Sequence, residues 1–143
     1  MNPEEYLHLG EELVGRKTPC GCRAGLGRAY YGVLQATAKW MEDAGLTPPS
    51  RQEIHQKLWQ DLLNCGIPEL RIAGSELAQL HGYRIKADYV MGDRDTEDFR
   101  TADYWVSLAR EHLEEIKRMF TGPDRDRAVD AIKAYRRLVN RRV

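Results

Sequence analysis

The sequence predicts an all-α protein: an up-and-down bundle of four or five helices, with one additional helix at the C-terminal end. Three observations indicate this fold class. No segment alternates apolar and polar residues with the β-branched enrichment of strands. Apolar residues recur instead at spacings of three and four, as on the buried face of a helix. Glycine or proline stands where most of these periodic segments stop, which is typical of helix ends.

Signals near the start of the chain predict the first two helices. Asn2 and Pro3 suit an N-cap and the first turn of a helix that extends to about Lys17. The residues expected on its apolar face are Tyr6, Leu9 and Leu13. The second helix is predicted over about 23–44 and ends at Gly45. The residues expected on its apolar face are Leu26, Tyr30, Val33, Thr37 and Met41.

The same periodicity predicts a third and a fourth helix, separated by Gly66. The third helix follows a turn at 47–50. Its apolar face is expected to contain Ile54, Leu58, Leu62 and Cys65. The fourth helix is predicted from about Pro68 to Gly92. The stripe predicted along it consists of Ala73, Leu77, Leu80, Arg84, Ala87 and Met91.

The fifth predicted helix has the most regular pattern, which is that of a helix packed in a bundle. Its apolar residues are Phe99, Ala102, Val106, Ala109, Leu113, Ile116 and Phe120. In the polar loop before it, Asp95 or Thr96 is expected to cap the helix. A final helix is predicted over about 124–142, after Gly122 and Pro123. Its expected core residues are Ala128, Ile132, Tyr135 and Val139.

Length and composition limit the classes of function. The 143 residues suit one domain, divided into a bundle over 1–120 and a basic helix over 121–143 that is part of the bundle or appended to it. The 22 Lys and Arg balance the 22 Asp and Glu, so the overall charge indicates neither nucleic acid nor membrane. No stretch is apolar enough to span a membrane, and the acidic N-terminus lacks signal-peptide features, so we expect a cytoplasmic protein. Three irregularly spaced cysteines indicate free thiols, and no metal or cofactor is expected.

Arg84 is the most informative single residue, because it stands in an apolar stripe where a leucine would be expected. An unpaired buried charge is costly, and Asp88, one helical turn away, is a suitable partner. One interpretation is a partly buried Arg–Asp pair that orients the fourth helix against the second. The other is an arginine held at a cleft or dimer seam, where its planar fork binds phosphate.

The second helix carries another polar group of residues, the segment R-A-Y-Y at 28–31. Tyr30 lies in the apolar stripe and Tyr31 flanks it. Buried tyrosines usually direct the hydroxyl to a polar partner. The Arg84–Asp88 pair is a candidate for that partner, and core packing with one polar contact is the simpler interpretation.

The final predicted helix is locally basic, with seven Lys and Arg against three Asp over 121–143. A solvent-exposed helix face is the favoured interpretation, and a patch for RNA or an acidic partner is the alternative. On the favoured interpretation Arg136 is exposed. We therefore expect Arg84→Ala to destabilise the fold more than Arg136→Ala.

The chain resembles the HEPN superfamily, and more narrowly its small stand-alone bacterial and archaeal members, in two segments and their order. These are R-A-Y-Y at 28–31 and R-x-x-A-D-Y at 84–89, with His55 between them, and the resemblance covers roughly residues 5–120. It implies a helical bundle, usually a homodimer, in an RNA-related or defence setting. Many members are toxins paired with an antitoxin of the nucleotidyltransferase fold, and active members are metal-independent ribonucleases.

The chain departs from the family at the catalytic motif. In active members an arginine at the dimer cleft is followed a few residues later by a histidine. Arg84 matches the arginine, but Asp88 and Tyr89 stand where the histidine is expected. An aspartate is ordinarily ionised near neutral pH, which makes it a poor substitute for a proton-donating histidine.

We therefore expect a HEPN-like dimeric binding or accessory module of a toxin–antitoxin or defence system, without the usual ribonuclease motif. The expected polar cluster consists of Arg28, Tyr30, Tyr31, Arg84 and Asp88. Its first expected role is to stabilise the fold, and its second is to bind nucleotide or RNA phosphate. One alternative is a divergent ribonuclease toxin, in which Arg84 stabilises charge on the scissile phosphate and Asp88 or Tyr89 transfers the proton. Another alternative is a purely structural bundle that docks a partner helix.

The expected partners follow from the same resemblance. They are a second copy of the chain and an operon partner such as a nucleotidyltransferase-fold antitoxin, and no membrane is expected. Trp40, Trp59 and Trp105 favour the homodimer, because the chain has more long apolar residues than one small bundle needs.

Overall fold

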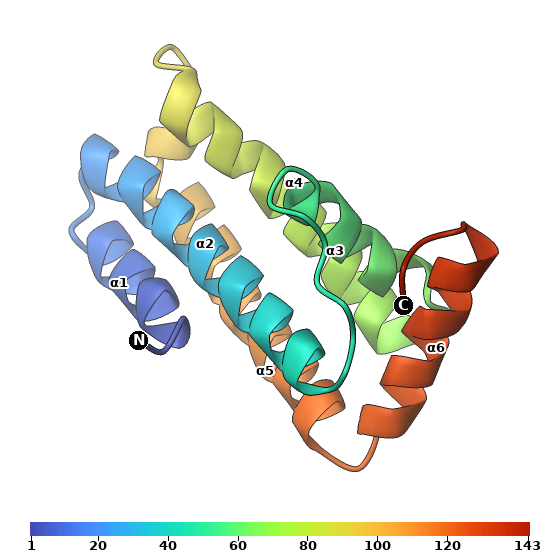
Figure 1. Ribbon diagram of the computed structural model, residues 1–143. Helices are drawn as coiled ribbons and strands as arrows, with labels where there is room; N and C mark the ends of the chain where they lie inside the picture. Colours follow the sequence, from blue (N-terminus) through green and yellow to red (C-terminus); the bar gives the residue numbers. More distant parts are fainter. The chain divides into compact units, whose positions relative to one another are not determined.

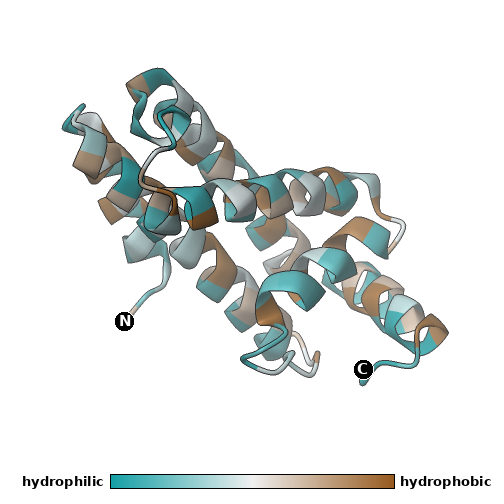
Figure 2. Ribbon diagram, turned by 90° about the horizontal axis from the view of Figure 1, so that it is seen from above, coloured by the Kyte–Doolittle hydropathy of each residue, from teal (hydrophilic) through white to brown (hydrophobic).

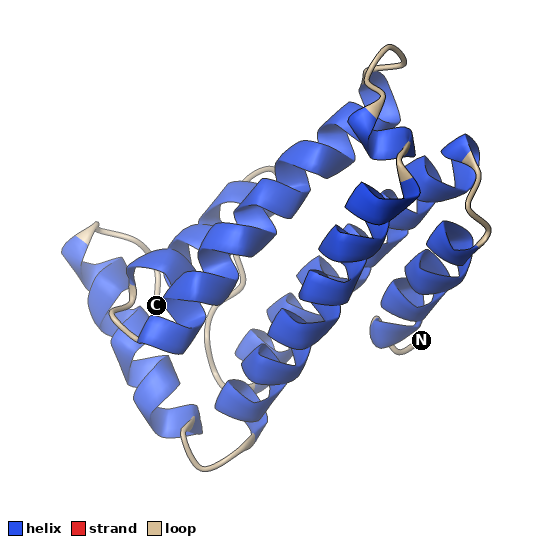
Figure 3. Ribbon diagram, turned by 180° about the vertical axis from the view of Figure 1, so that it is seen from behind, coloured by secondary structure: helices blue, strands red, loops and turns tan.

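The computed structural model describes residues 1–143 and contains helices and loops with no strand (Figure 3). The predicted all-α class is confirmed. In chain order the elements are α1 (Glu4–Gly15), α2 (Pro19–Asp43), α3 (Ile54–Asn64), α4 (Pro68–Tyr89), the 3₁₀ helix η1 (Asp95–Glu97), α5 (Phe99–Thr121) and α6 (Arg125–Leu138) (Figure 1). None of the helices combines the length and apolar character needed to cross a membrane.

The chain divides into two compact units. Unit 1 comprises Met1–Ala36 and Gln79–Glu111, and unit 2 comprises Thr37–Ala78 and His112–Val143. Helix α1 belongs to unit 1, and α3 and α6 belong to unit 2, while each of the three longest helices has one part in each unit. The division predicted at residues 120 and 121 stays a prediction. The basic C-terminal helix α6 packs against α3 within unit 2.

Regular apolar periodicity predicted the buried faces of α2 and α5 correctly. Every residue predicted on the apolar face of α2 is buried, and on α5 all are buried except the partly exposed Phe99. Hydrophilic and hydrophobic residues follow one another along the helices of the chain in Figure 2, as expected of amphipathic elements. The glycine that ends α2, Gly45, has a φ of 101°, which favours a residue without a side chain.

Helix α1 buries a different face from the one predicted. Leu7, Gly10 and Val14 are buried, whereas Leu9 is 37% exposed. The reason is backbone contact between α1 and the first part of α2. A Cβ placed on Gly10 would lie 2.7 Å from the carbonyl oxygen of Gly25, so the two helices approach each other more closely than larger side chains permit.

Two helix starts also differ from the prediction. Helix α2 begins at Pro19, four residues early, because the Thr18 hydroxyl accepts the Gly21 N–H at 3.0 Å and caps the helix. The cap of α5 is Asp98, since Asp95 and Thr96 form part of η1. The Asp98 carboxylate accepts the backbone N–H and the hydroxyl of Thr101, both at 2.9 Å, and these bonds lower the pKa of Asp98.

Unit 2 has its own apolar core, to which α3 and α6 contribute with parts of the long helices. Its largest fully buried apolar side chains are Leu58, Leu62, Leu70, Leu77, Leu113 and Ile116. Helix α6 follows the predicted face as far as Ala128 and Ile132. Its next buried residue is Arg136, whereas Val139 is 43% exposed, so the predicted end of this apolar face was wrong.

Candidate functional site

Most of the predicted polar cluster meets in a pocket between α2 and α4, within unit 1. We call this the α2–α4 pocket. It has a volume of about 260 Å³. Its lining residues are Ala24, Gly27, Arg28, Tyr31, Arg84 and Asp88. Ala24, Gly27, Arg28 and Tyr31 recur at spacings of three and four along one face of α2, and Arg84 and Asp88 are four positions apart on α4.

The predicted pairing of Arg84 with Asp88 is present. Arg84 Nε lies 2.9 Å from Asp88 Oδ2, and the two side chains are 17% and 37% exposed. The contact is an ion pair without hydrogen-bond alignment, because the buried Nε has no acceptor. The guanidinium also lies 5.7 Å from the ring centre of Tyr31, within the range of a cation–π contact. Arg84 is therefore held by the charge of Asp88 and by the ring face of Tyr31, and its buried Nε makes no hydrogen bond to the protein.

Arg28 provides the second cation of the pocket. Its side chain is exposed, and its guanidinium lies 6.0 Å from the ring centre of Tyr6 without a carboxylate partner. Tyr6 meets Tyr31 edge to face, with ring centres 6.5 Å apart. Gly27 forms part of the floor beside Asp88, and a Cβ there would stand 3.5 Å from Asp88 Oδ1, an ordinary van der Waals distance. The side chains around the pocket are thus two arginines, one carboxylate and one phenol.

This arrangement favours an anionic ligand. Two guanidinium groups against one carboxylate leave a formal excess of one positive charge. Guanidinium forks match the oxygens of phosphate, and the bonds between them are charge-assisted. Each guanidinium packs against a tyrosine ring, which restricts its orientations before binding. Less side-chain entropy is therefore lost when a ligand binds.

Two predicted site residues lie outside the pocket lining. Tyr30 is fully buried, and its ring stacks on His81 with centres 5.0 Å apart and planes 17° apart. Tyr89 ends α4 and is 72% exposed. Adjacent helical positions point about 100° apart, so Tyr31 faces the pocket when Tyr30 faces the core.

Arg23 supports the end of α4, a role that no sequence pattern predicted. Its guanidinium donates to the backbone oxygens of Ala87 at 2.9 Å and Asp93 at 2.7 Å, with further bonds to those of Lys86 and Met91. Its Nε donates to Glu97 at 3.0 Å. Backbone carbonyls leave no trace in a residue pattern, so no sequence signal identifies this contact. The bonds tie the loop after α4 to α2, close in sequence to Asp88.

The most buried ionic cluster lies in unit 2 and includes Arg136, so the prediction that Arg136 is exposed was wrong. Its side chain is 1% exposed and donates through Nε and one Nη to Asp61 Oδ2, at 3.2 and 2.7 Å. Asp61 is fully buried and also accepts from Arg141 at 2.8 Å. A sequence signal existed: Arg136 follows Ile132 by four residues and Asp61 follows Leu58 by three, both on apolar faces.

The thiols and the ring nitrogens show no second centre of this kind. The three cysteines are free, and burial, followed by the Asp98 charge, raises the pKa of Cys22, which disfavours its thiolate. No group of three or more His, Cys, Asp or Glu is placed to hold a metal ion. In comparisons with protein-family models, curated proteins and solved structures, the chain matches none of them.

Proposed function

We propose that the chain is a HEPN-like binding or accessory module whose α2–α4 pocket takes a phosphate group of RNA or of a nucleotide. The observation that carries the proposal is the state of Arg84. It is mostly buried and paired with one carboxylate, yet its buried Nε has no hydrogen-bond acceptor in the protein. Buried donors are normally satisfied, so donors left over beside a pocket suit a ligand.

Arg136 shows how a purely structural arginine looks in the same chain. Its guanidinium donates to Asp61 and to the backbone oxygens of Thr47 and Arg142. Nearly all of its donors are therefore used by the protein. Arg84 makes one ion pair and one ring contact, and it lines a pocket that also holds Arg28.

The proposal excludes the usual ribonuclease mechanism of the family. That mechanism needs a histidine beside the arginine to move protons, and the α2–α4 pocket is lined by none. The divergent ribonuclease is the second candidate, with Asp88, the carboxylate paired with Arg84, as the proton carrier. The high exposure of Tyr89 and its place outside the lining weigh against it in that role.

Loss of either pocket arginine is expected to weaken RNA binding. Arg28→Gln and Arg84→Gln should each raise the Kd for single-stranded RNA by about fivefold to tenfold, since each removes a charge-assisted phosphate contact. In a plot of the logarithm of the association constant against the logarithm of the salt concentration, the slope is negative, and each substitution should reduce its magnitude by about one. Fluorescence anisotropy over a series of salt concentrations measures both quantities.

Arg16→Gln is the matched control, because Arg16 is an exposed arginine of unit 1 outside the pocket. Its Kd should equal that of the unchanged protein. The same RNA, recovered after incubation without metal, should remain intact. Robust cleavage that disappears in Arg84→Gln would replace the proposal with the divergent ribonuclease. Equal Kd values for all variants would remove phosphate binding from this pocket.

The proposal includes a homodimer, although not through Trp59 and Trp105, two of the three tryptophans on which the dimer was predicted. Trp59 and Trp105 are 3% and 8% exposed and belong to the cores. The large apolar side chains left exposed near the end of α4 are Ile85, Tyr89, Val90 and Met91. Light scattering over a concentration series should give twice 16.5 kDa, and a mass of 16.5 kDa throughout would contradict the dimer.

We place the module in the cytoplasm, in a toxin–antitoxin or defence setting, as the family resemblance suggests. The partner of that setting is a protein of the nucleotidyltransferase fold encoded by a neighbouring gene. Free thiols at Cys20, Cys22 and Cys65 agree with a reducing compartment.

A further inference from the structure

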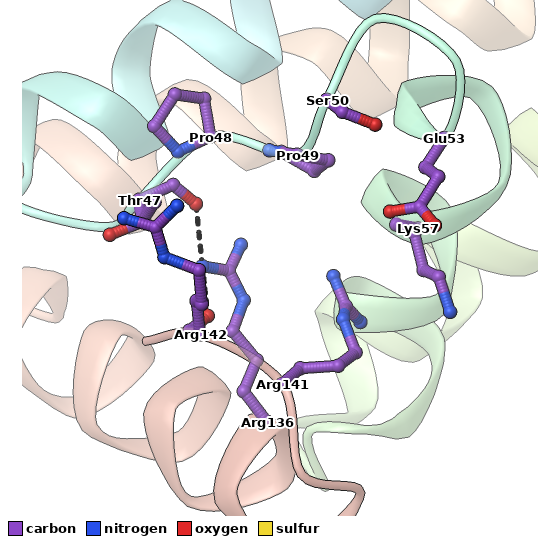
Figure 4. Close-up of a pocket in the computed structure, with 9 residues that line it drawn as sticks. All are labelled: Thr47, Pro48, Pro49, Ser50, Glu53, Lys57, Arg136, Arg141 and Arg142. Carbon is purple, nitrogen blue, oxygen red and sulfur yellow. Dashed lines mark hydrogen bonds between the residues drawn. The ribbon is translucent and has the colours of Figure 1, made fainter.

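Unit 2 contains a second polar pocket, which involves none of the residues of the α2–α4 pocket. It lies between the loop before α3, the start of α3 and the segment after α6, and its volume is about 340 Å³ (Figure 4). The residues that line it are Thr47, Pro48, Pro49, Ser50, Glu53, Lys57, Arg136, Arg141 and Arg142. We call it the loop–α6 pocket.

Arg136 and Arg141 are fixed at one wall of this pocket by a shared carboxylate. Both guanidinium groups bind Asp61, which is fully buried behind them. Arg141 uses two nitrogens for Asp61, at 2.8 and 3.4 Å, and its side chain is 16% exposed. One carboxylate thus holds two cations, and Arg141 retains N–H groups that no protein acceptor takes.

The loop opposite is held in place before any ligand arrives. Arg136 donates to the Thr47 oxygen at 2.7 Å, the bond drawn in Figure 4. The Thr47 N–H donates to Val143 O at 3.2 Å. Pro48 and Pro49 follow, and their rings restrict the backbone. Because this wall is already ordered, ligand binding carries a smaller entropic cost.

Two further cations of the lining, Lys57 and Arg142, have no carboxylate partner. With Arg136 and Arg141 they make four cations, against the carboxylates of Glu53 and Asp61. The side-chain balance is therefore +2, and a free carboxylate at Val143 would reduce it to +1. Such an excess around a pocket of this size suits a small ligand with a doubly charged oxyanion.

We infer that the loop–α6 pocket binds the phosphate group of a small phosphate monoester. Arg141 and Arg142 supply forked donors, Lys57 supplies a point charge, and the Ser50 hydroxyl supplies a neutral donor. A phosphate monoester is a dianion above its second pKa of about 6, which matches the excess charge better than a carboxylate or a sulfonate does. The inference is independent of the proposed function, since the two pockets share no residue.

Phenyl phosphate and benzenesulfonate are the matched probes, because they have similar shapes and differ in charge above about pH 7. Titration followed through backbone amide NMR signals should give saturable shifts at residues 47–57 and 141–143 with phenyl phosphate. Benzenesulfonate should bind several times more weakly. Lowering the pH below about 5.5, where the phosphate becomes a monoanion, should weaken the binding of phenyl phosphate towards that of the sulfonate.

Three changes at the rim test the pocket without touching its buried pair. Arg142→Gln and Lys57→Gln should each raise the Kd by about threefold to fivefold, since each removes a partly solvated cation. Glu53→Gln should lower the Kd, because the carboxylate repels the ligand and makes no capping bond to α3. Arg137→Gln, an exposed arginine of α6 outside the lining, should leave the Kd unchanged.

The outcomes separate this pocket from the α2–α4 pocket. Arg84→Gln should leave the shifts at 47–57 intact even where it weakens RNA binding. Unsaturated shifts up to about 10 mM ligand, equal affinity for the two probes, or equal Kd values for Arg142→Gln and Arg137→Gln would each overturn the inference. Shifts confined to residues 24–31 would place the phosphate in unit 1 and would overturn it as well.

Discussion

Arg136→Ala is expected to lower the free energy of unfolding by about 3–5 kcal/mol, the range for breaking a buried ion pair. The side chain is 1% exposed, and its removal takes away both bonds to Asp61 and the bond to the Thr47 oxygen. Asp61, which is fully buried, keeps only Arg141 as a partner. Most of the cost is that of a buried charge left poorly compensated.

Urea unfolding followed by circular dichroism measures this difference. Arg137→Ala is the matched control, because Arg137 is next to Arg136 on the same helix and its side chain is exposed. This substitution should change the free energy of unfolding by less than about 0.5 kcal/mol. Arg84→Ala should fall between the two, since Arg84 and Asp88 are both more exposed than the pair in unit 2. Equal midpoints for Arg136→Ala and Arg137→Ala would contradict the burial of Arg136.

A double-mutant cycle identifies the partner. Arg136→Ala and Asp61→Ala should not be additive, because each change removes the same pair, and the coupling should exceed about 1 kcal/mol. Additive effects would mean that Arg136 stabilises the protein through its backbone acceptors, the oxygens of Thr47 and Arg142, and not through Asp61.

Gly25→Ala is expected to destabilise the protein by about 2–3 kcal/mol through overpacking between α1 and α2. The new Cβ would stand 2.7 Å from the Gly10 oxygen and 2.5 Å from Val14 Cγ2. Because the first of these atoms belongs to the backbone, a rotamer change cannot relieve the contact. The helices have to separate, which loosens the packing around Leu7 and Val14, both buried.

Gly82→Ala is the control for this substitution. Gly82 lies inside α4 and has no atom within 4 Å of the position of its Cβ. There the alanine should stabilise the protein by about 0.5–1 kcal/mol, since glycine is the poorer helix former. In thermal unfolding experiments, Gly25→Ala should lower the Tm and Gly82→Ala should raise it. A Gly25→Ala protein as stable as Gly82→Ala would show that α1 does not pack on α2 in this way.

The sequence by itself determined the elements and the local pairs. The helical class, the buried faces of α2 and α5, and the ends at Gly45 and Gly66 follow from periodicity and from backbone freedom, which act within one helix. Pairing of Arg84 with Asp88 was predictable for the same reason, because i and i+4 residues are neighbours on any helix.

Only the tertiary structure decided which faces and which charges became buried. On α1 the buried face is centred on Gly10 and not on the larger residues Leu9 and Leu13. The reason is the close backbone approach of Gly10 to Gly25, which lies on another helix. Arg136 and Asp61 are 75 residues apart, and each alone is a charged residue among apolar ones. Their burial required a partner from another helix, which periodicity along one helix does not specify.

The candidate site divides in the same way. The sequence identified Arg28, Tyr31, Arg84 and Asp88 as polar residues at helical spacing. It also put Tyr30 in this cluster, whereas in the structure Tyr30 stacks on His81. It gave no sign of Arg23, whose acceptors are mostly backbone oxygens of a distant segment. Residue type and spacing encode the chemistry available on a helix face. The packing of α2 against α4 decides which of those groups share a pocket, because it brings together residues more than 50 positions apart.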